Sequence, residues 1–200
     1  AKLNANIEPR LIKAIQKNSQ LLAKIPPARL YEEVIKLFHN ENSIVVFREL
    51  FKLGLLKHLF SQTNENSFVT ASLINTSKRI KSGNSVTPAF LFAVFLWSAL
   101  NKRLSQISKK NKSRIELMLE ASEYVIKQQT QQVMMPRWLS SRVKDVWLMQ
   151  YQLENYHPKK SKTLIRSPRF RMAYDFLVLR SESIDKGLKV KAEYWTNIQK

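Results

Sequence analysis

Two runs of basic residues stand out in this sequence, because their residue types and spacing suit one chemical task, the binding of phosphate groups. The run NKRLSQISKKNKSR, residues 101–114, holds six basic residues and no acidic one. The run HPKKSKTLIRSPRFR, residues 157–171, likewise holds six basic residues and no acid. Lys and Arg bind phosphate through charge-assisted hydrogen bonds, so both runs are candidate nucleic-acid contacts.

The second run gives the stronger prediction because of where its arginines fall. Ser167 and Pro168 predict the start of a helix, which places Arg169 and Arg171 in the first turn. Cations are unfavourable at that positive end of the helix dipole. Arg171 can pair with Asp175, four residues on, whereas Arg169 has no local partner. A phosphate bound at the free N–H groups of this helix start would offset the cost.

The first run has a partly structural explanation. Lys102 and Arg103 come at the end of an apolar helix, where cations complement the negative end of the dipole. The remainder of the run is typical of a solvated linker. Trp138 lies off the apolar stripe of its predicted helix and next to Arg137 and Arg142. We predict partial burial beside a cation for Trp138, with stacking on a nucleic-acid base as the alternative.

The residues of a catalyst are missing from the sequence. The three glycines, at positions 54, 83 and 187, stand too far apart for a phosphate-binding loop. The aspartates at 145, 175 and 185 cannot form an Asp-x-Asp metal clamp. The histidines at 39, 58 and 157 have no partner at ligand spacing, which predicts surface or packing roles. We therefore expect no catalytic residue, no metal site and no cofactor in this chain.

Composition points to a polyanionic partner. Lys and Arg total 34 against 15 acidic residues, and the resulting net charge of +19 exceeds the ~2–8 of a small soluble domain. Nucleic acid explains this excess better than a membrane surface does. The longest apolar run, PAFLFAVFLWSAL, has 13 residues, short of the roughly 20 that cross a bilayer. With no cysteine and no secretory signal, we predict a cytoplasmic protein.

Start and stop signals divide the chain into amphipathic helices, and no alternating strand pattern is present. Pro9, Pro26, Pro136 and Pro168 each open an apolar-periodic run, and Gly54 ends another. Ser43 and Thr87 are predicted caps, and Ser113 with Glu116 forms a capping-box pattern. The predicted fold is all-α, a multi-helix bundle without a sheet. Its helices are expected at 9–25, 27–38, 44–53, 88–104, 117–127, 136–155 and 168–183, with a short one after residue 187.

Four blocks in one order along the chain carry a family resemblance: IPPARLYEEVIKLF, VTPAFLFAVFLWSAL, MPRWLSSRVKDVWLMQ and SPRFRMAYDFLVLR. They resemble the C-terminal part of bacterial poly(A) polymerase, which shares its plan with the tRNA CCA-adding enzymes of the class II nucleotidyltransferase superfamily. The blocks cover roughly a third of the chain. Residues 61–85, 101–130 and the last twelve are less diagnostic.

The resemblance implies a division of the chain. The stretch ARLYEE is similar to the family's neck motif, which implies structural supporting roles for Arg29 and Glu33. Residue chemistry alone explains Arg29 by a surface ion pair with Glu32 or Glu33. The opening residues 1–3 resemble the end of the segment after the family's base-reading motif. Residues 1–60 are then the remainder of the neck, residues 61–200 are the body and RNA-binding region, and the catalytic head is absent.

The resemblance also implies a function for the parent protein. It would add AMP from ATP to RNA 3′ ends with Mg²⁺, in RNA polyadenylation and mRNA processing. The present chain would bind RNA without itself being active. The candidate RNA-binding residues are Lys109, Lys110, Lys112, Arg114, Lys159, Lys160, Lys162, Arg166, Arg169 and Arg171.

Two alternatives stay open at this point. A CCA-adding enzyme would share the plan, and nucleotide choice by the full-length protein would separate the two. A helical adaptor that binds proteins rather than RNA predicts an exposed apolar groove and binding that tolerates salt.

Overall fold

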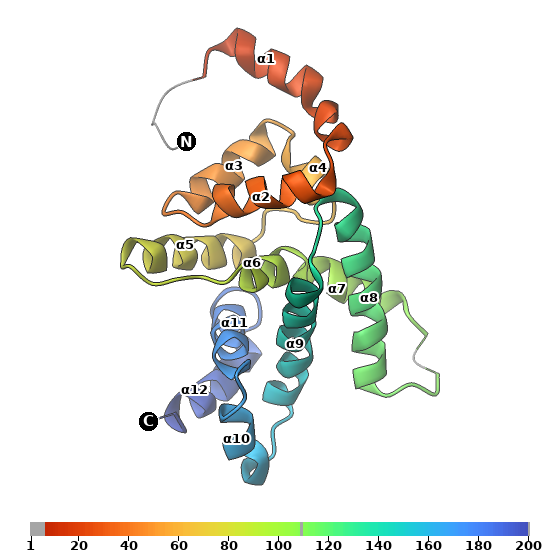
Figure 1. Cartoon of the computed structure of the whole chain (residues 1–200). Coiled ribbons are helices and arrows are strands. Elements are labelled where there is room, and N and C mark those ends of the chain that lie inside the picture. Colours follow the sequence, from red (N-terminus) through yellow and green to blue (C-terminus); the bar gives the residue numbers. More distant parts are fainter. Residues whose placement is uncertain (1–6, 109, 200) are drawn as a thin grey trace.

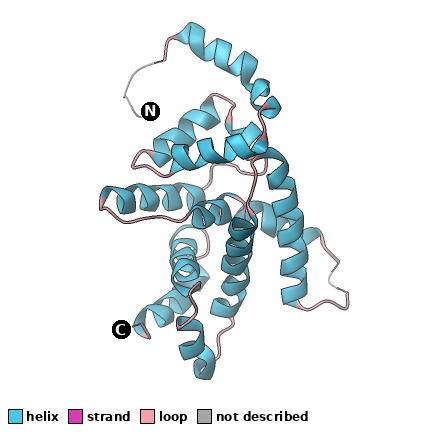
Figure 2. Ribbon diagram, viewed as in Figure 1, coloured by secondary structure: helices cyan, strands magenta, loops and turns pink. Residues whose placement is uncertain are grey.

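The structure is a computed structural model that describes residues 7–108 and 110–199. Over these ranges the chain forms twelve α-helices and two short 3₁₀ helices, and Figure 2 shows no strand in them. The all-α prediction is confirmed. Within the same ranges, no helix has the length and apolar character needed to cross a membrane.

Figure 1 shows the N-terminal helices at one end of an elongated molecule and the C-terminal helices at the other. The first six helices are α1 (Pro9–Asn18), α2 (Pro27–Phe38), α3 (Ser43–Lys52), α4 (Leu56–Leu59), α5 (Ser67–Lys81) and α6 (Pro88–Phe95). The remaining six are α7 (Trp97–Gln106), α8 (Arg114–Gln132), α9 (Arg137–Glu154), α10 (Pro158–Ile165), α11 (Phe170–Ser183) and α12 (Lys189–Asn197). The 3₁₀ helices are Ser19–Lys24 and Lys186–Leu188.

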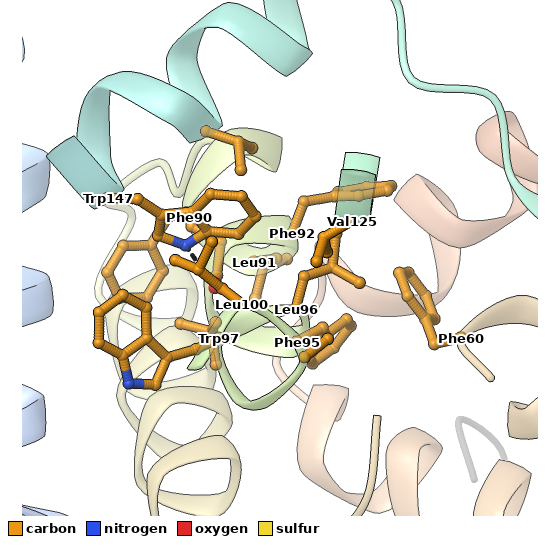
Figure 3. Close-up of a cluster of buried hydrophobic side chains, with 14 of the residues drawn as sticks. Phe60, Phe90, Leu91, Phe92, Phe95, Leu96, Trp97, Leu100, Val125 and Trp147 are labelled. Carbon is orange, nitrogen blue, oxygen red and sulfur yellow. Dashed lines mark hydrogen bonds between the residues drawn. The ribbon is translucent and has the colours of Figure 1, made fainter. Parts of the chain in front are cut away.

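Helix α6 is the centre of the core, because every residue from Ala89 to Phe95 is buried. The Thr87 side chain caps its start, as predicted, by accepting from the Phe90 N–H. The expected single helix over 88–104 is wrong in one respect, since it is interrupted at Leu96, where ψ is 0°. On one side of the break Phe95 packs on Phe60 (Figure 3). On the other side Trp97 packs on Phe176 of α11.

Aromatic rings join the N-terminal helices to this centre. Phe38 at the end of α2 and Phe47 of α3 both contact Phe95, with ring centroids 5.0 and 5.7 Å apart. A second buried cluster lies at the C-terminal end, where Phe170 of α11 packs on Trp195 of α12 at 5.5 Å. Tilted and edge-to-face ring pairs of this kind add to the apolar area they bury and fix the relative orientation of the helices.

Of the other predicted helix starts and ends, some are confirmed and some are wrong. The capping box of Ser113 and Glu116 is present, and Gly54 ends α3 with a φ of 70°. Ser43 is the first residue of α3 rather than its cap, because its hydroxyl contacts the Leu73 carbonyl and Ser77 of α5 instead. The helix expected over 9–25 changes to 3₁₀ geometry at Ser19. Helices α4, α5 and α10 were not predicted.

The pH dependence of stability is expected to reflect His39, which follows α2. Burial lowers the pKa of His39, and backbone carbonyls of Ile35 and Val86 oppose this to a smaller extent. Neither ring nitrogen completes a hydrogen bond among the described residues. The folded state thus favours neutral His39, whereas the unfolded chain takes up its proton near pH 6.5. Stability supplied by His39 is therefore complete above that pH and is lost as pH falls toward the folded-state pKa.

Unfolding in urea between pH 7.5 and 5.5 measures this effect. His39→Gln should flatten the decline in the free energy of unfolding, though not fully, because burial lowers the pKa of His58 as well. Gln152→Ala, at an exposed position of α9 without a titratable group, is the control and should leave the slope unchanged. An unaltered slope in His39→Gln would refute the assignment.

Candidate nucleic-acid interface

Four arginines line one pocket on the surface, and we call it the arginine pocket. It has a volume of about 380 Å³ and is bounded by the C-terminal half of α5, the loop before α6, the second turn of α9 and the start of α11. The arginines are Arg79 from α5, Arg142 from α9, and Arg169 and Arg171 from the start of α11. Val86, Phe90 and Met172 supply an apolar part of the wall.

Two aspartates hold three of these arginines in place. Asp175 accepts from Arg79 Nη1 at 3.3 Å and lies 3.2 Å from Arg171 Nε. Asp145 of α9 accepts from Arg169 Nε at 2.9 Å. The residues that line the pocket, together with their ion-pair partners, therefore carry four positive and two negative charges. A guanidinium has five N–H donors, and these contacts leave several of them on each arginine for a ligand.

Trp138 and Arg142 extend this surface along α9. Trp138 is 46% exposed, and the Arg142 guanidinium lies 5.4 Å from the centre of its ring. The predicted cation–π neighbour is confirmed. An exposed indole beside a cation is a surface on which a nucleic-acid base can stack.

The second basic run is divided between α10 and the arginine pocket. Lys159, Lys160 and Lys162 are exposed on α10, and Arg166 is exposed at its C-terminal end. Of this run, only Arg169 and Arg171 line the pocket.

The prediction that Arg169 stands in the first turn of its helix is wrong. Helix α11 begins at Phe170, so Arg169 is the residue before its first turn. Arg169 also has a counter-ion, Asp145, which is 24 residues away in sequence. The predicted pair of Arg171 with Asp175 is confirmed. Cations do stand in a first turn at α10, where Lys159 and Lys160 follow Pro158 and no acidic residue is present.

The first basic run lies elsewhere. Lys110, Lys112 and Arg114 are exposed in the loop before α8 and at its start, and none of them lines the arginine pocket. Lys112 is paired with Glu120. Lys109 lies outside the described residues. Arg103, at the end of α7, covers the ring of Tyr124 at 4.2 Å, which supports the structural explanation for that part of the run.

The two neck-motif residues are exposed on α2. Glu33 pairs with Lys36 at 2.8 Å, and among the described residues Arg29 forms no ion pair with Glu32 or Glu33. The expected surface pair of Arg29 with these glutamates is therefore wrong. Glu33 stands between two basic residues of the same helix face, four residues after Arg29 and three before Lys36, and its carboxylate contacts Lys36.

Two residues of the arginine pocket, Arg79 and Arg142, were not predicted from the sequence as site residues. Arg79 falls in the last turn of α5, a helix that was not predicted, among cations that suit a helix C-terminus. Arg142 was noted only as a neighbour of Trp138. The spacing of Trp138 and Arg142, four residues apart on the polar face of α9, was the one available signal.

The described residues contain no group of three or more histidine, cysteine, aspartate or glutamate side chains that could hold a metal ion. The Mg²⁺ implied for the parent protein therefore finds no matching ligand set in this part of the chain. What the arrangement offers instead is recognition of an anion by fixed cations.

Two family models match the chain and together cover about three quarters of it. Residues 4–66 match the model described as "Probable RNA and SrmB- binding site of polymerase A". Residues 110–200 match "Polymerase A arginine-rich C-terminus". Arg142, Arg169 and Arg171 of the arginine pocket lie within the second match, and Arg79 lies between the two.

Similar proteins align along the whole chain. Poly(A) polymerase I of Salmonella typhi is 29% identical over 211 residues, and the enzyme of that name from Escherichia coli O6:H1 is 28% identical over 212. Poly(A) polymerase I of Haemophilus influenzae is 28% identical over 213 residues. The chain spans about 45% of the length of these relatives. Both family models and these full-chain alignments show that the chain belongs to the bacterial poly(A) polymerase family, of which it represents a C-terminal part.

Proposed function

We propose that this chain is the RNA-holding part of a poly(A) polymerase, which adds AMP from ATP to RNA 3′ ends with Mg²⁺. RNA polyadenylation in the cytoplasm, as a step of mRNA processing, is the corresponding role. The catalytic groups, including the Mg²⁺ ligands, would belong to a head domain that is not part of these 200 residues. The division into neck (1–60) and body (61–200) remains part of this proposal.

The observation that carries the proposal is the path of cations along α10 and into the arginine pocket. Lys159, Lys160 and Lys162 form no ion pair with any described residue, whereas Lys112 of the other basic run is paired. Lys159 and Lys160 also stand at the positive end of the α10 dipole, where an anion is favoured. The chain continues from α10 through Arg166 directly to Arg169 and Arg171. A flexible single strand can follow such a path with its phosphates.

The CCA-adding alternative has no comparable observation in its favour. The matched family models and relatives are those of poly(A) polymerase, which disfavours a CCA-adding parent. The binding experiment below tests the protein adaptor, because an adaptor would not bind RNA in a salt-dependent way.

Replacing Lys159, Lys160 and Lys162 together by Gln should weaken binding of single-stranded RNA and reduce its salt dependence. If about five phosphates are neutralised, log K falls against log salt with a slope of roughly −3.5 in the unaltered chain. Loss of three contacts should flatten the slope by about 2. Fluorescence anisotropy with a labelled oligo(A) at several salt concentrations measures both values.

The matched control replaces Lys110, Lys112 and Arg114 by Gln, which removes the same charge from the loop before α8. We expect a smaller change in slope, because Lys112 is already neutralised by Glu120. Equal slopes for the two triple variants would leave only diffuse attraction, and salt-insensitive binding would favour the adaptor.

A further inference from the structure

The arginine pocket is too well ordered to be only a region of diffuse positive charge. Its arginines come from α5, α9 and α11, and ion pairs fix three of them at distances of 2.9–3.3 Å. A solvated basic surface has no need of such fixing, since attraction to RNA at long range depends on charge alone. Fixed guanidinium groups from separate elements, in contrast, are the usual means of orienting a phosphate.

We propose that the arginine pocket is a subsite for one nucleoside phosphate, and that Asp175 is a positioning residue for Arg79 and Arg171 within it. This inference rests on the proposed RNA-binding function where the phosphate belongs to an RNA strand. A free nucleotide offers the same chemistry, and the experiment below separates the two sources.

Charge and size agree with this ligand. The four arginines of the pocket and the two aspartates paired with them have a net charge of +2. A phosphate monoester carries about −1.5 to −2 at pH 7, and an RNA phosphodiester carries about −1. The volume of about 380 Å³ lies at the small end of the ~300–1,000 Å³ typical of ligand pockets. The site therefore suits a single nucleotide and not a longer stretch of strand.

The walls provide for both parts of a nucleotide. Residues at the starts of α6 and α11 line the pocket, so the positive ends of two helix dipoles lie beside the arginines. Val86, Phe90 and Met172 form the apolar side, against which a ribose or base can pack. Trp138, beside Arg142, offers a stacking surface for a base of the next nucleotide.

Asp175 has an unusual place in such a site, because its charge repels a phosphate. Its Oδ2 accepts from Arg79 Nη1, 96 residues away in sequence, and from Arg171 Nε on its own helix. The side chain is 23% exposed, so water screens this charge only in part. By holding both guanidinium groups, Asp175 removes the entropy cost of ordering two long side chains when the ligand binds.

The direction in which one substitution changes the affinity for RNA tests the positioning role of Asp175. Asp175→Asn removes a negative charge from an RNA-binding surface, and simple electrostatics predicts tighter binding. If Asp175 positions the arginines, oligo(A) should instead bind about threefold more weakly, the size of effect expected for a partly exposed ion-pair contact. Asp175→Glu keeps the carboxylate and should restore part of the affinity. The control Glu182→Gln removes an exposed charge from the same helix and should leave binding unchanged or slightly tighter.

The subsite itself is tested with 5′-AMP and adenosine as probes, by calorimetry on the 200-residue chain. AMP should bind and adenosine should not, and Arg142→Gln with Arg171→Gln should weaken AMP binding about tenfold or more. Circular dichroism of each variant checks that the helices are intact. Tighter oligo(A) binding by Asp175→Asn would overturn the positioning role, and AMP binding that survives the double arginine variant would overturn the subsite.

The outcomes also separate this inference from the proposed function. Salt-dependent RNA binding that is lost in the α10 variant but unchanged in the pocket variants refutes the subsite and supports RNA holding. AMP binding that depends on the pocket, in a chain that does not bind oligo(A), supports the subsite with free nucleotide as its ligand and refutes RNA holding.

Discussion

Replacing Trp147 by Ala should lower the free energy of unfolding by about 3–5 kcal/mol, the range found when a large core aromatic is removed. Trp147 lies in the middle of α9 and is fully buried against α6, as Figure 3 shows. Its indole Nε1 donates to the Ala93 carbonyl at 3.1 Å. Alanine would leave a cavity at the centre of the main core, and the buried Ala93 carbonyl would lose the hydrogen bond from the indole. For a chain of this size the melting temperature should fall by roughly 6–20 °C.

Thermal and urea unfolding followed by circular dichroism measure this change. Trp138→Ala is the matched control on the same helix, because Trp138 is 46% exposed, and it should cost less than about 1 kcal/mol. Similar losses in the two variants would mean that the contact between α6 and α9 does not hold the fold together. Trp147→Phe should fall between them, since it keeps a ring in the core and loses the indole hydrogen bond.

Replacing Arg180 by Met should lower the free energy of unfolding by about 3 kcal/mol, because it breaks an ion pair and not because it leaves a cavity. Arg180 is 6% exposed and lies where α7, α9 and α11 meet. Its Nη1 donates to Gln150 at 3.1 Å and to Glu154 at 2.5 Å, and its guanidinium lies 4.6 Å from the Trp97 ring centre. Methionine would fill part of the space but leave the Glu154 carboxylate without its cation. Breaking a buried ion pair from one side typically costs ~3–5 kcal/mol, and the 27% exposure of Glu154 favours the low end.

A double-mutant cycle distinguishes lost charge from lost packing. Glu154→Leu added to Arg180→Met removes the stranded carboxylate, so most of the lost stability should return. If the two substitutions simply add, the ion pair is not what makes Arg180 important, and its contact with Trp97 becomes the explanation. RNA affinity should change little in the folded double variant, because Arg180 does not line the arginine pocket.

Local signals in the sequence determined much of the fold. Thr87 and the pair Ser113–Glu116 cap their helices as expected, because a cap depends only on residues within one turn. Apolar periodicity was enough for the all-α class and for the buried run at α6. The family resemblance was also visible in the order of four sequence blocks.

The tertiary structure decided the candidate site. The contact of Arg79 with Asp175 joins residues 96 apart, and that of Arg169 with Asp145 joins residues 24 apart. No helix-scale rule relates such positions, since their meeting depends on how α5, α9 and α11 pack. The start of α11 at Phe170 moved Arg169 out of the first turn and beside α9. Sequence alone thus identified a basic protein of this family, while packing selected four of its arginines and placed them around one pocket.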